Sequence, residues 1–452
     1  MSASSEADQL LRQGRSLYSQ GRRSESAAIY GQALEISPNH YDALLSLGRI
    51  RQQEGQLDEA EALFLRASDT DAGPDLRALI LLSSLHDQRE SYDEAIDIAQ
   101  RCTKAFPDND MAWRHLGNMF MHQRNMDEAW AAYGRAHALL REPGSKHGLE
   151  RPGFKRTTRA KLKHDIEQLQ YLMNRQITDK DFSGVIGDYN SLLEAMPKGL
   201  DDGAVVNLPP RALQAIAEHY NRCHYQADAQ PLDDGAINPD LDTEAICDAY
   251  FSHEPGITWV DDLLRPEALD RLRNFCLEST IWYDADHPNG YVGAYVYDGF
   301  ACPLLKQITQ ELPATLPRIF KDRPLTQLWA YKYDSTLSGI EMHADTAAIN
   351  VNFWLTPTGA NEDSETGGLV LWDKEVPLDW HSDEFNRSDP AQKAALLEYL
   401  QQQGAQQVRV SYRQNRAVVF NSDLLHKTDD IHFKPGYENR RINVTMLYGW
   451  RE

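Results

Sequence analysis

The stretch Gly339-Ile-Glu-Met-His-Ala-Asp-Thr-Ala-Ala-Ile-Asn-Val-Asn-Phe-Trp-Leu-Thr356 places a histidine and an aspartate two positions apart in the chain. Side chains alternate between the two faces of a β-strand, so a strand here puts His343 and Asp345 on one face. An imidazole nitrogen and a carboxylate on one face supply two ligands of a metal site. The third ligand then has to come from another segment.

The length and charge of the chain limit what it can be. With 452 residues it exceeds what a single hydrophobic core usually organises, so two or three domains are expected. Its hydrophobic content of 41% and charged content of 25% are ordinary for a globular protein. The formal net charge of -22 argues against sequence-independent binding to nucleic acid or to an anionic membrane, because both need a basic surface.

The cysteines and the first residues indicate the compartment. The five cysteines are scattered and none has CxxC spacing, so neither a disulfide framework nor a zinc knuckle is expected. Residues 1–10 are polar and lack the pattern of a secretory signal. No apolar run approaches the ~20 residues of a membrane span. These observations predict a cytoplasmic protein with no membrane partner.

An internal repeat occupies the first third of the chain. Frames that start at Ala7, Tyr41, Asp75 and Asp110 are each about 34 residues long and resemble tetratricopeptide repeats. Small residues fall where two helices must approach closely, and large residues fall where a gap must be filled. The matching positions are Gly14, Tyr30, Ala33 and Pro38; Gly48, Ala60, Phe64 and Ala67; a degenerate third set of Leu82, Ser83, Ala95 and Cys102; and Trp113, Gly117, Tyr133 and Ala136.

The resemblance covers residues 7–142 and implies an all-α solenoid domain over residues 1–145. Each repeat is a pair of antiparallel helices, and stacking of the pairs creates a concave groove. By analogy with the family, Tyr18, Arg49, Arg114 and Asn118 face that groove. The groove is interpreted as a binding site for a protein or peptide, and a packing or dimerisation scaffold is the alternative.

Residues 146–256 are predicted to be a helical capping or linker region. Leu162, Ile166, Leu169 and Met173 recur at helical spacing within a basic segment, which predicts one amphipathic helix over residues 155–175. Because an open solenoid end must be covered, this helix is interpreted as a cap on the last repeat.

Residues 257–452 are predicted to be rich in short strands. Runs such as 281–285, 325–333, 341–345, 349–355, 417–421 and 441–448 alternate with Gly- and Pro-containing turns, which favours a barrel or sandwich. Helices are expected from Pro266 and over 303–320 and 391–402.

Three segments of this region resemble the Fe(II)- and 2-oxoglutarate-dependent oxygenases. They are His343-Ala-Asp345, His426 after the strand 417–421, and Arg440-Arg441-Ile-Asn443 on a last strand. The lead-in 259–266 and the Gly367-Gly368 turn look more like the prolyl-hydroxylase branch. The resemblance implies a double-stranded β-helix, a jelly-roll or cupin-like fold, with flanking helices. The whole chain is then an α+β multidomain protein.

The resemblance also implies the roles of these residues. His343, Asp345 and His426 would bind Fe(II), which leaves three positions for 2-oxoglutarate and O2. The far carboxylate of 2-oxoglutarate needs a buried cation, and arginine offers a two-pronged donor. Strand alternation places residues 441, 443, 445 and 447 on one face. The family pattern has an arginine on the inner wall with a small polar residue two positions on, so the resemblance favours Arg441 with Asn443 over Arg440. Tyr333 is expected to bond the same carboxylate, with Tyr331 as its competitor, and Asn350, Asn352 and Trp354 are substrate candidates.

Other histidines compete for the metal. His40 and Asp42 form the same pair at a repeat junction, where a surface position is expected. His381 and Asp383 form another in a charged stretch, and His432 competes with His426 from a polar loop. None of them has the strand setting of the chosen residues.

The sequence thus predicts a 2-oxoglutarate-dependent dioxygenase that hydroxylates a protein or peptide side chain, with the repeats helping to recruit the substrate. Two alternatives remain open at this point. One is a hydroxylase of a small molecule or natural product, and the other is a non-catalytic repeat scaffold with an inactive barrel.

Overall fold

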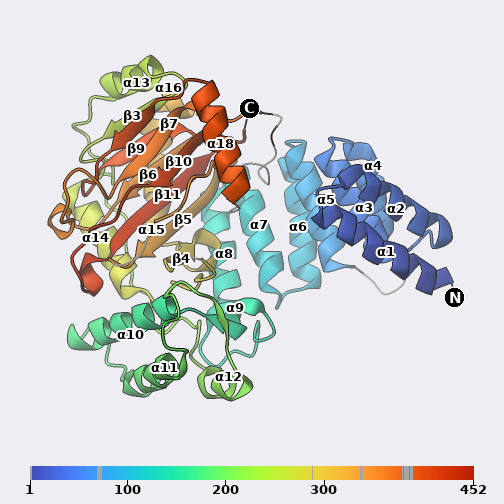
Figure 1. The fold of residues 1–452 in the computed structure, drawn as a ribbon, viewed down its shortest axis with the longest axis horizontal. Coiled ribbons are helices and arrows are strands. Elements are labelled where there is room, and N and C mark those ends of the chain that lie inside the picture. Colours follow the sequence, from blue (N-terminus) through green and yellow to red (C-terminus); the bar gives the residue numbers. More distant parts are fainter. Residues whose placement is uncertain are drawn as a thin grey trace. The chain divides into compact units, whose positions relative to one another are not determined.

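The chain folds into two compact units, Met1–Ala136 and His137–Glu452, in this computed structural model (Figure 1). We call them unit 1 and unit 2. The structure describes residues 3–68, 74–287, 289–335, 339–378, 380, 386 and 390–451.

Unit 1 is built from antiparallel helix pairs, and the second helix of its last pair continues into unit 2. In each pair a glycine or serine of the first helix faces the second helix. A Cβ atom at Gly14, Gly48 or Gly117 would collide with a ring sixteen residues later, in Tyr30, Phe64 or Tyr133 respectively. The helices are α1 (Ala3–Ser19), α2 (Arg23–Ile36), α3 (Tyr41–Gln53), α4 (Leu57–Ser68), α5 (Leu76–Gln88), α6 (Tyr92–Ala105), α7 (Asp110–His122) and α8 (Met126–Arg141).

The third helix pair, α5 and α6, departs from this pattern at both positions of the contact. Ser83 takes the glycine position and Ala99 takes the ring position, and both are fully buried. A larger residue on one helix thus faces a smaller one on the next, which preserves the packed volume. The Ser83 hydroxyl donates to the carbonyl of Ala95 (2.8 Å), so its polar atom is satisfied.

Residues 146–256, predicted as a capping or linker region, belong to unit 2. The predicted amphipathic helix is α10, and its apolar side packs against α11 and α12 in one buried cluster. The stripe is therefore covered by residues of its own region. The elements are α9 (Pro152–Lys155), β1 (Arg156–Thr157), α10 (Arg159–Asn174), α11 (Ser183–Ala195), β2 (Val206–Asn207), α12 (Pro210–Ile216) and α13 (Thr243–Ser252).

The rest of unit 2 contains two antiparallel sheets. One has the order β3-β9-β6-β11-β5-β4 and the other the order β10-β7-β8. The strands are β3 (Ile257–Val260), β4 (Val292–Tyr295), β5 (Leu325–Tyr333), β6 (Ile349–Trp354), β7 (Leu369–Glu375), β8 (Gln407–Val410), β9 (Ala417–Asn421), β10 (Leu424–Thr428) and β11 (Arg441–Tyr448).

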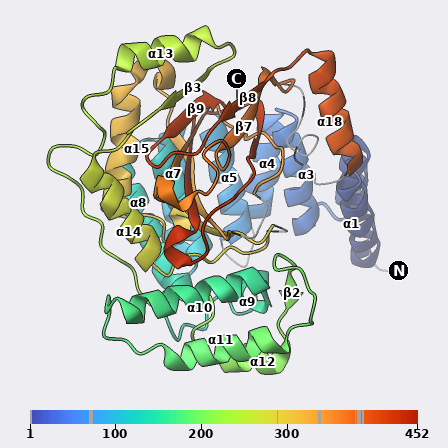
Figure 2. The same cartoon turned by 60° about the vertical axis from the view of Figure 1, so that its left-hand side comes forward.

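One core cluster joins the two sheets. It includes Trp329 and Leu447 from the larger sheet and Leu371 and Val410 from the smaller one. Helices α13, α14 (Pro266–Glu278) and α15 (Pro303–Thr315) lie along one side of the strands (Figure 2). The predicted helix near 391–402 is α18 (Pro390–Gln402), and short α16 (Pro317–Phe320) and the 3-10 turns η1 (Val296–Asp298), η2 (Thr358–Ala360) and η3 (Tyr437–Asn439) complete the unit.

Two predicted strands are wrong. Residues 281–285 pair only through a bridge between Asp284 and Gly293, and residues 341–345 pair only through a bridge between His343 and His426. On its other side, β10 pairs with β7, and the register of that pairing shifts between Leu424 and His426. The shift is an irregularity of the β-bulge kind next to His426. His426 itself lies within β10, a strand that the sequence pattern did not reveal.

Candidate metal centre

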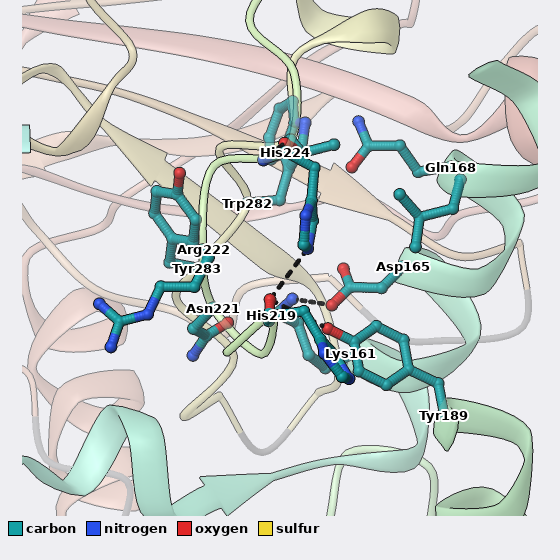
Figure 3. Close-up of a pocket in the computed structure, with 12 residues that line it drawn as sticks. Lys161, Asp165, Gln168, Tyr189, His219, Asn221, Arg222, His224, Trp282 and Tyr283 are labelled. Atoms are coloured by element: carbon teal, nitrogen blue, oxygen red, sulfur yellow. Dashed lines mark hydrogen bonds and ion pairs between the residues drawn. The ribbon is translucent and has the colours of Figure 1, made fainter. Parts of the chain in front are cut away.

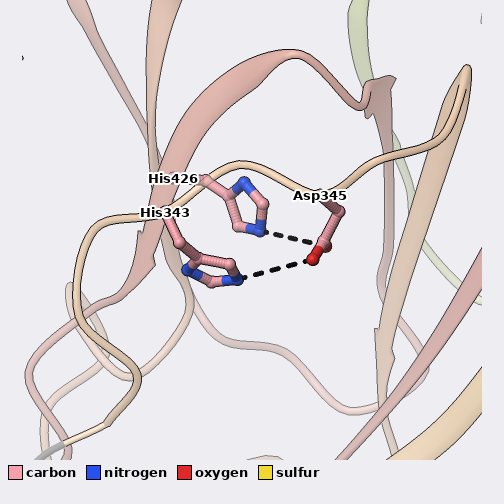
Figure 4. Close-up of side chains that lie close together, drawn as sticks. All are labelled: His343, Asp345 and His426. Atoms are coloured by element: carbon pink, nitrogen blue, oxygen red, sulfur yellow. Dashed lines mark ion pairs between the residues drawn. The ribbon is translucent and has the colours of Figure 1, made fainter. Parts of the chain in front are cut away.

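His343, Asp345 and His426 meet although no continuous strand carries the first two (Figure 4). The Nε2 atom of His343 lies 3.8 Å from Oδ1 of Asp345, and the Nε2 atom of His426 lies 3.6 Å from Oδ2. The ligand atoms of the three residues all lie within 4.8 Å of one another. These separations exceed hydrogen-bond lengths, so the three groups surround a common point rather than bonding to each other.

The backbone fixes both imidazoles in the orientation that a metal ligand needs. Nδ1 of His343 is 2.8 Å from the carbonyl oxygen of Glu341, and Nδ1 of His426 is 3.0 Å from that of Leu424. Each Nδ1–H therefore donates to a carbonyl, which leaves the Nε2 lone pair directed toward Asp345. Burial lowers the pKa of His426 to about 4, so its imidazole is neutral near pH 7.

This donor set fits a divalent transition metal. Two imidazoles and one carboxylate with open positions are the arrangement of non-haem Fe(II) oxygenases. His426 is buried, whereas His343 and Asp345 are partly exposed, so the point they surround is reachable from one side.

The cluster opens into a cavity of about 210 Å³ between the two sheets. Its walls come from β5, β6, β7, β10, β11 and the segments that carry Tyr291 and Ile340. Several of the predicted residues line it, and Asn350 and Trp354 are not among them. The lining consists of Tyr291, Trp329, Tyr331, Tyr333, Ile340, His343, Asp345, Asn352, Leu369, His426, Thr428, Arg441, Asn443 and Thr445.

Arg441 is a buried cation with spare hydrogen-bonding capacity. Its side chain is 1% exposed, and its Nε and Nη2 donate to the carbonyls of Gly367 (2.7 Å) and Gly368 (3.2 Å). Its Nη1 is buried and has no hydrogen-bond partner among the described residues. The guanidinium also lies 5.1 Å from the ring centroid of Tyr333. A buried donor without an acceptor is costly, so this corner of the cavity suits an anionic ligand.

Arg440 points away from the cavity. Its Nε donates to Glu167 of α10 (2.8 Å), and its Nη2 lies 2.8 Å from a carboxylate oxygen of Asp334. This arginine therefore ties the start of β11 to helix α10. The strand alternation expected from the sequence thus separates the two neighbouring arginines.

The other predicted residues take different places. Tyr331 and Tyr333 both line the cavity, but the Tyr331 hydroxyl is 3.1 Å from that of Tyr295, whereas Tyr333 is the one beside Arg441. Asn352 and Asn443 also line it. Trp354 is fully buried and packs on Tyr412 at 5.3 Å between ring centroids, so its role is packing.

The competing histidines lie elsewhere. His432 is exposed, and His40 caps the start of α3 by accepting from the amide of Ala43. His381 and Asp383 lie outside the described residues. Sequence reasoning missed Thr445, Trp329 and Tyr291 as cavity residues. Alternation from Arg441 and Asn443 along the same strand could have identified Thr445.

A second cavity in unit 2 lies beside α10 (Figure 3). Its volume is only about 20 Å³, which is room for about one water molecule. Lys161 and Asp165 form a buried ion pair on its wall, and the carbonyl of His219 accepts from Nε2 of His224 (2.9 Å). A space of this size holds no ligand larger than a water molecule, so the cavity is a packing feature.

Unit 1 holds a groove of about 550 Å³. Tyr18 and Arg49 line it as predicted, whereas Arg114 and Asn118 are not among its lining residues. The Asn118 side chain instead accepts from the hydroxyl of Tyr133 (2.8 Å). The groove is lined by Arg15, Tyr18, Tyr30, Asp42, Leu45, Ser46, Arg49, Leu76, Arg77, Ile80, Leu81 and Met111.

Comparison with known families identifies the class of unit 1. Residues 17–82 and residues 80–142 each match a family model described as tetratricopeptide repeat. The predicted repeats are therefore confirmed, and such repeats generally mediate protein–protein interactions. No helix in the described part of the chain is both long and apolar enough to cross a membrane.

Individual relatives match only part of this chain. The human protein O-mannosyl-transferase TMTC1 is 27% identical over 120 residues, which is 26% of this chain and 14% of that protein's length. Among solved structures, MamA from Desulfovibrio magneticus RS-1 is 21% identical over 29% of this chain and 75% of that chain, with a TM-score of 0.27. The Cut9–Hcn1 complex is 18% identical over 30% of this chain and 25% of that chain, also with a TM-score of 0.27. Likenesses this weak carry no information about activity.

Proposed function

We propose that unit 2 is an Fe(II)- and 2-oxoglutarate-dependent dioxygenase domain that hydroxylates a side chain of a protein or peptide. The observation that carries this proposal is that one cavity contains both the cluster of His343, Asp345 and His426 and the buried Arg441. The cluster suits a metal, and the unpartnered Nη1 of Arg441 suits a carboxylate. A cosubstrate with a metal-chelating end and a carboxylate end matches both requirements.

The strand order supports a double-stranded β-helix. In such a fold, the chain crosses repeatedly between two facing antiparallel sheets. Here β5, β6, β9 and β11 belong to the larger sheet, and β7, β8 and β10 belong to the smaller one, so the chain crosses between the sheets after β6, β8, β9 and β10. The bridge between His343 and His426 extends the smaller sheet by one short pairing beyond β10. The ligands would then lie at the mouth of this fold.

The chain's own residues have separable tasks in this mechanism. His343, Asp345 and His426 would hold Fe(II), which with 2-oxoglutarate and O2 supplies the oxidising chemistry for hydroxylation. Arg441 would bind the far carboxylate of 2-oxoglutarate. Burial raises the pKa of Tyr333, so its phenol stays protonated and able to donate to the same carboxylate. Aromatic walls around them exclude water from the reacting centre.

The size of the cavity favours a peptidyl substrate. At about 210 Å³ it is smaller than the ~300–1,000 Å³ of pockets that enclose drug-sized ligands. After 2-oxoglutarate has entered, the remaining space suits one side chain rather than a whole natural product. A substrate whose bulk stays outside needs further binding surface, and a repeat domain provides it.

The groove of unit 1 suits an extended segment with acidic and apolar residues. Its lining combines aliphatic side chains with Arg15, Arg49 and Arg77 and a single carboxylate, that of Asp42. Asp42 pairs with Arg15 (3.2 Å) and with Arg77 (3.1 Å), and Arg49 is exposed with no ion pair described. Cationic groups in a chain of net charge -22 mark this groove as a site for an anionic partner.

The test is an anaerobic titration of the full-length protein with Fe(II) and 2-oxoglutarate, followed by absorption spectroscopy. We expect the charge-transfer band of the Fe(II)–2-oxoglutarate chelate, its loss in His343→Ala, and its retention in His432→Ala. The absence of a band in the unmodified protein, or a band that survives His343→Ala, would contradict the proposal and favour a non-catalytic repeat scaffold. Turnover of 2-oxoglutarate with peptides and with free amino acids then separates a peptide hydroxylase from a small-molecule hydroxylase.

A further inference from the structure

Asn350 is a buried amide that contacts the candidate ligand Asp345. Its side chain is fully buried on β6, and its Nδ2 donates to Oδ2 of Asp345 at 2.6 Å. It does not line the cavity, so the substrate role predicted for it does not match its position. Burial of an amide is unfavourable unless its hydrogen bonds are made, and here they are made to a carboxylate.

A chain of side-chain hydrogen bonds continues from Asn350 across the sheet. Nδ2 of Asn352 donates to Oδ1 of Asn350 (2.6 Å), and Nδ2 of Asn443 donates to Oδ1 of Asn352 (2.8 Å). The Thr445 hydroxyl also donates to Oδ1 of Asn352 (2.8 Å) and accepts from Asn443 (2.9 Å). All four polar residues are at most 5% exposed.

The direction of this series of hydrogen bonds follows from the group at its end, the carboxylate of Asp345. An ionised carboxylate only accepts hydrogen bonds, so Asn350 must turn its NH2 group toward Asp345 and its oxygen toward Asn352. Asn352 must then donate to Asn350 and accept from Asn443 and Thr445. Every donor thus points along one line toward Asp345, and aligned hydrogen bonds of this kind strengthen one another.

We propose that Asn350 is a positioning residue that fixes the rotamer of Asp345 and occupies Oδ2, so that Oδ1 is the oxygen offered to the metal. This inference rests on the proposed function. A second bond supports it from the backbone side, since the Ser422 hydroxyl donates to the Asp345 carbonyl (3.1 Å). Asn352, Asn443 and Thr445 hold Asn350 in the donating orientation. Partners that orient a metal ligand typically contribute 10- to 100-fold to metal affinity.

The test compares Co(II) affinity and thermal stability in the full-length protein. Asn350→Leu keeps the side-chain volume and removes the donor, so we expect Co(II) binding to weaken by about 10- to 100-fold. Thermal stability should fall as well, because the buried Nδ2 of Asn352 loses its acceptor, and the control variant Asn415→Gly separates the two effects. Thr445→Val breaks only the far end of the chain, and its effect should be a few-fold at most. The visible absorption of bound Co(II) should change in Asn350→Leu, because a freed carboxylate can bind through both oxygens.

Asn415→Gly is the matched control. Asn415 is also a buried amide, it bonds the backbone of Leu264 through both of its polar atoms, and its φ of 63° is one that glycine adopts without strain. This variant should lower thermal stability and leave Co(II) affinity unchanged. Unaltered affinity and absorption in Asn350→Leu would overturn the inference and leave the proposed function intact. Failure of the unmodified protein to bind Co(II) at all would instead overturn the proposed function.

Discussion

The groove of unit 1 and the cavity of unit 2 both hold arginines, but in opposite environments. In the groove, Arg49 is exposed, and Arg15 and Arg77 share the carboxylate of Asp42. In the cavity, Arg441 is almost fully buried and still has an unpartnered donor. Water and salt screen the charges of the groove arginines. Arg441 in the cavity instead acts at short range through directed hydrogen bonds. We therefore expect changes in the cavity to have large, ligand-specific effects and changes in the groove to have small, salt-dependent ones.

Substitution of Arg441 should have the largest effect. Arg441→Leu removes the buried cation proposed to bind the far carboxylate of 2-oxoglutarate. Loss of one partner of a buried, hydrogen-bonded charge pair costs about 2–5 kcal/mol, so the KM for 2-oxoglutarate should rise by at least about 30-fold. Steady-state kinetics with varied 2-oxoglutarate measures this rise.

Arg440→Leu is the matched control for that measurement. Arg440 directly precedes Arg441 in the chain and is also buried, but it bonds Glu167 and Asp334 on the other side of the sheet. It should lower the melting temperature and leave the KM for 2-oxoglutarate nearly unchanged. If both variants raised this KM alike, the assignment of Arg441 as the anchor would fail.

The two units also differ in how far the sequence predicts them. In unit 1 the packing partners are close in the chain. Gly48 faces the ring of Phe64 and Gly117 faces the ring of Tyr133, each sixteen residues later. A local period is therefore enough to reveal the repeats. Their degenerate member, with Ser83 and Ala99, was recognisable only because its neighbours set the register.

A substitution in the helix packing of unit 1 should have an effect of intermediate size, on the stability of the fold. Gly48→Ala places a methyl group against the ring of Phe64, and such overpacking costs about 1–3 kcal/mol of folding free energy. Gly31→Ala lies in α2 with no atom near its added Cβ, so it should stabilise the protein by about 0.5–1 kcal/mol. Thermal unfolding measures both changes. Equal melting temperatures for the two variants would contradict the close helix contact, and neither variant should alter Co(II) affinity.

The candidate site depends on contacts that no local pattern contains. Alternation along β11 correctly separated Arg441 from Arg440, because a strand period of two applies within one segment. The expected strand over residues 341–345 is absent, and His343 reaches His426 through a single bridge at the irregularity in β10. The hydrogen bond from Asn350 to Asp345 was missed for a similar reason, since it spans a segment whose path the sequence does not specify.

Charge reversal in the groove should have the smallest effect. Arg49→Glu should weaken binding of a peptide that contains Asp, Glu and Leu by at most about 5-fold, because exposed ion pairs contribute about 0.2–1 kcal/mol. The loss should shrink at high salt, since exposed charges are screened. The same peptide with Asn and Gln in place of its acids should bind weakly and respond little to the variant.

Arg12→Glu is the matched control variant. It makes the same charge change outside the groove lining and should leave binding unaltered. Fluorescence anisotropy of the labelled peptides at two ionic strengths measures these differences, and equal losses in Arg49→Glu and Arg12→Glu would show that net charge, rather than the groove, attracts the peptide.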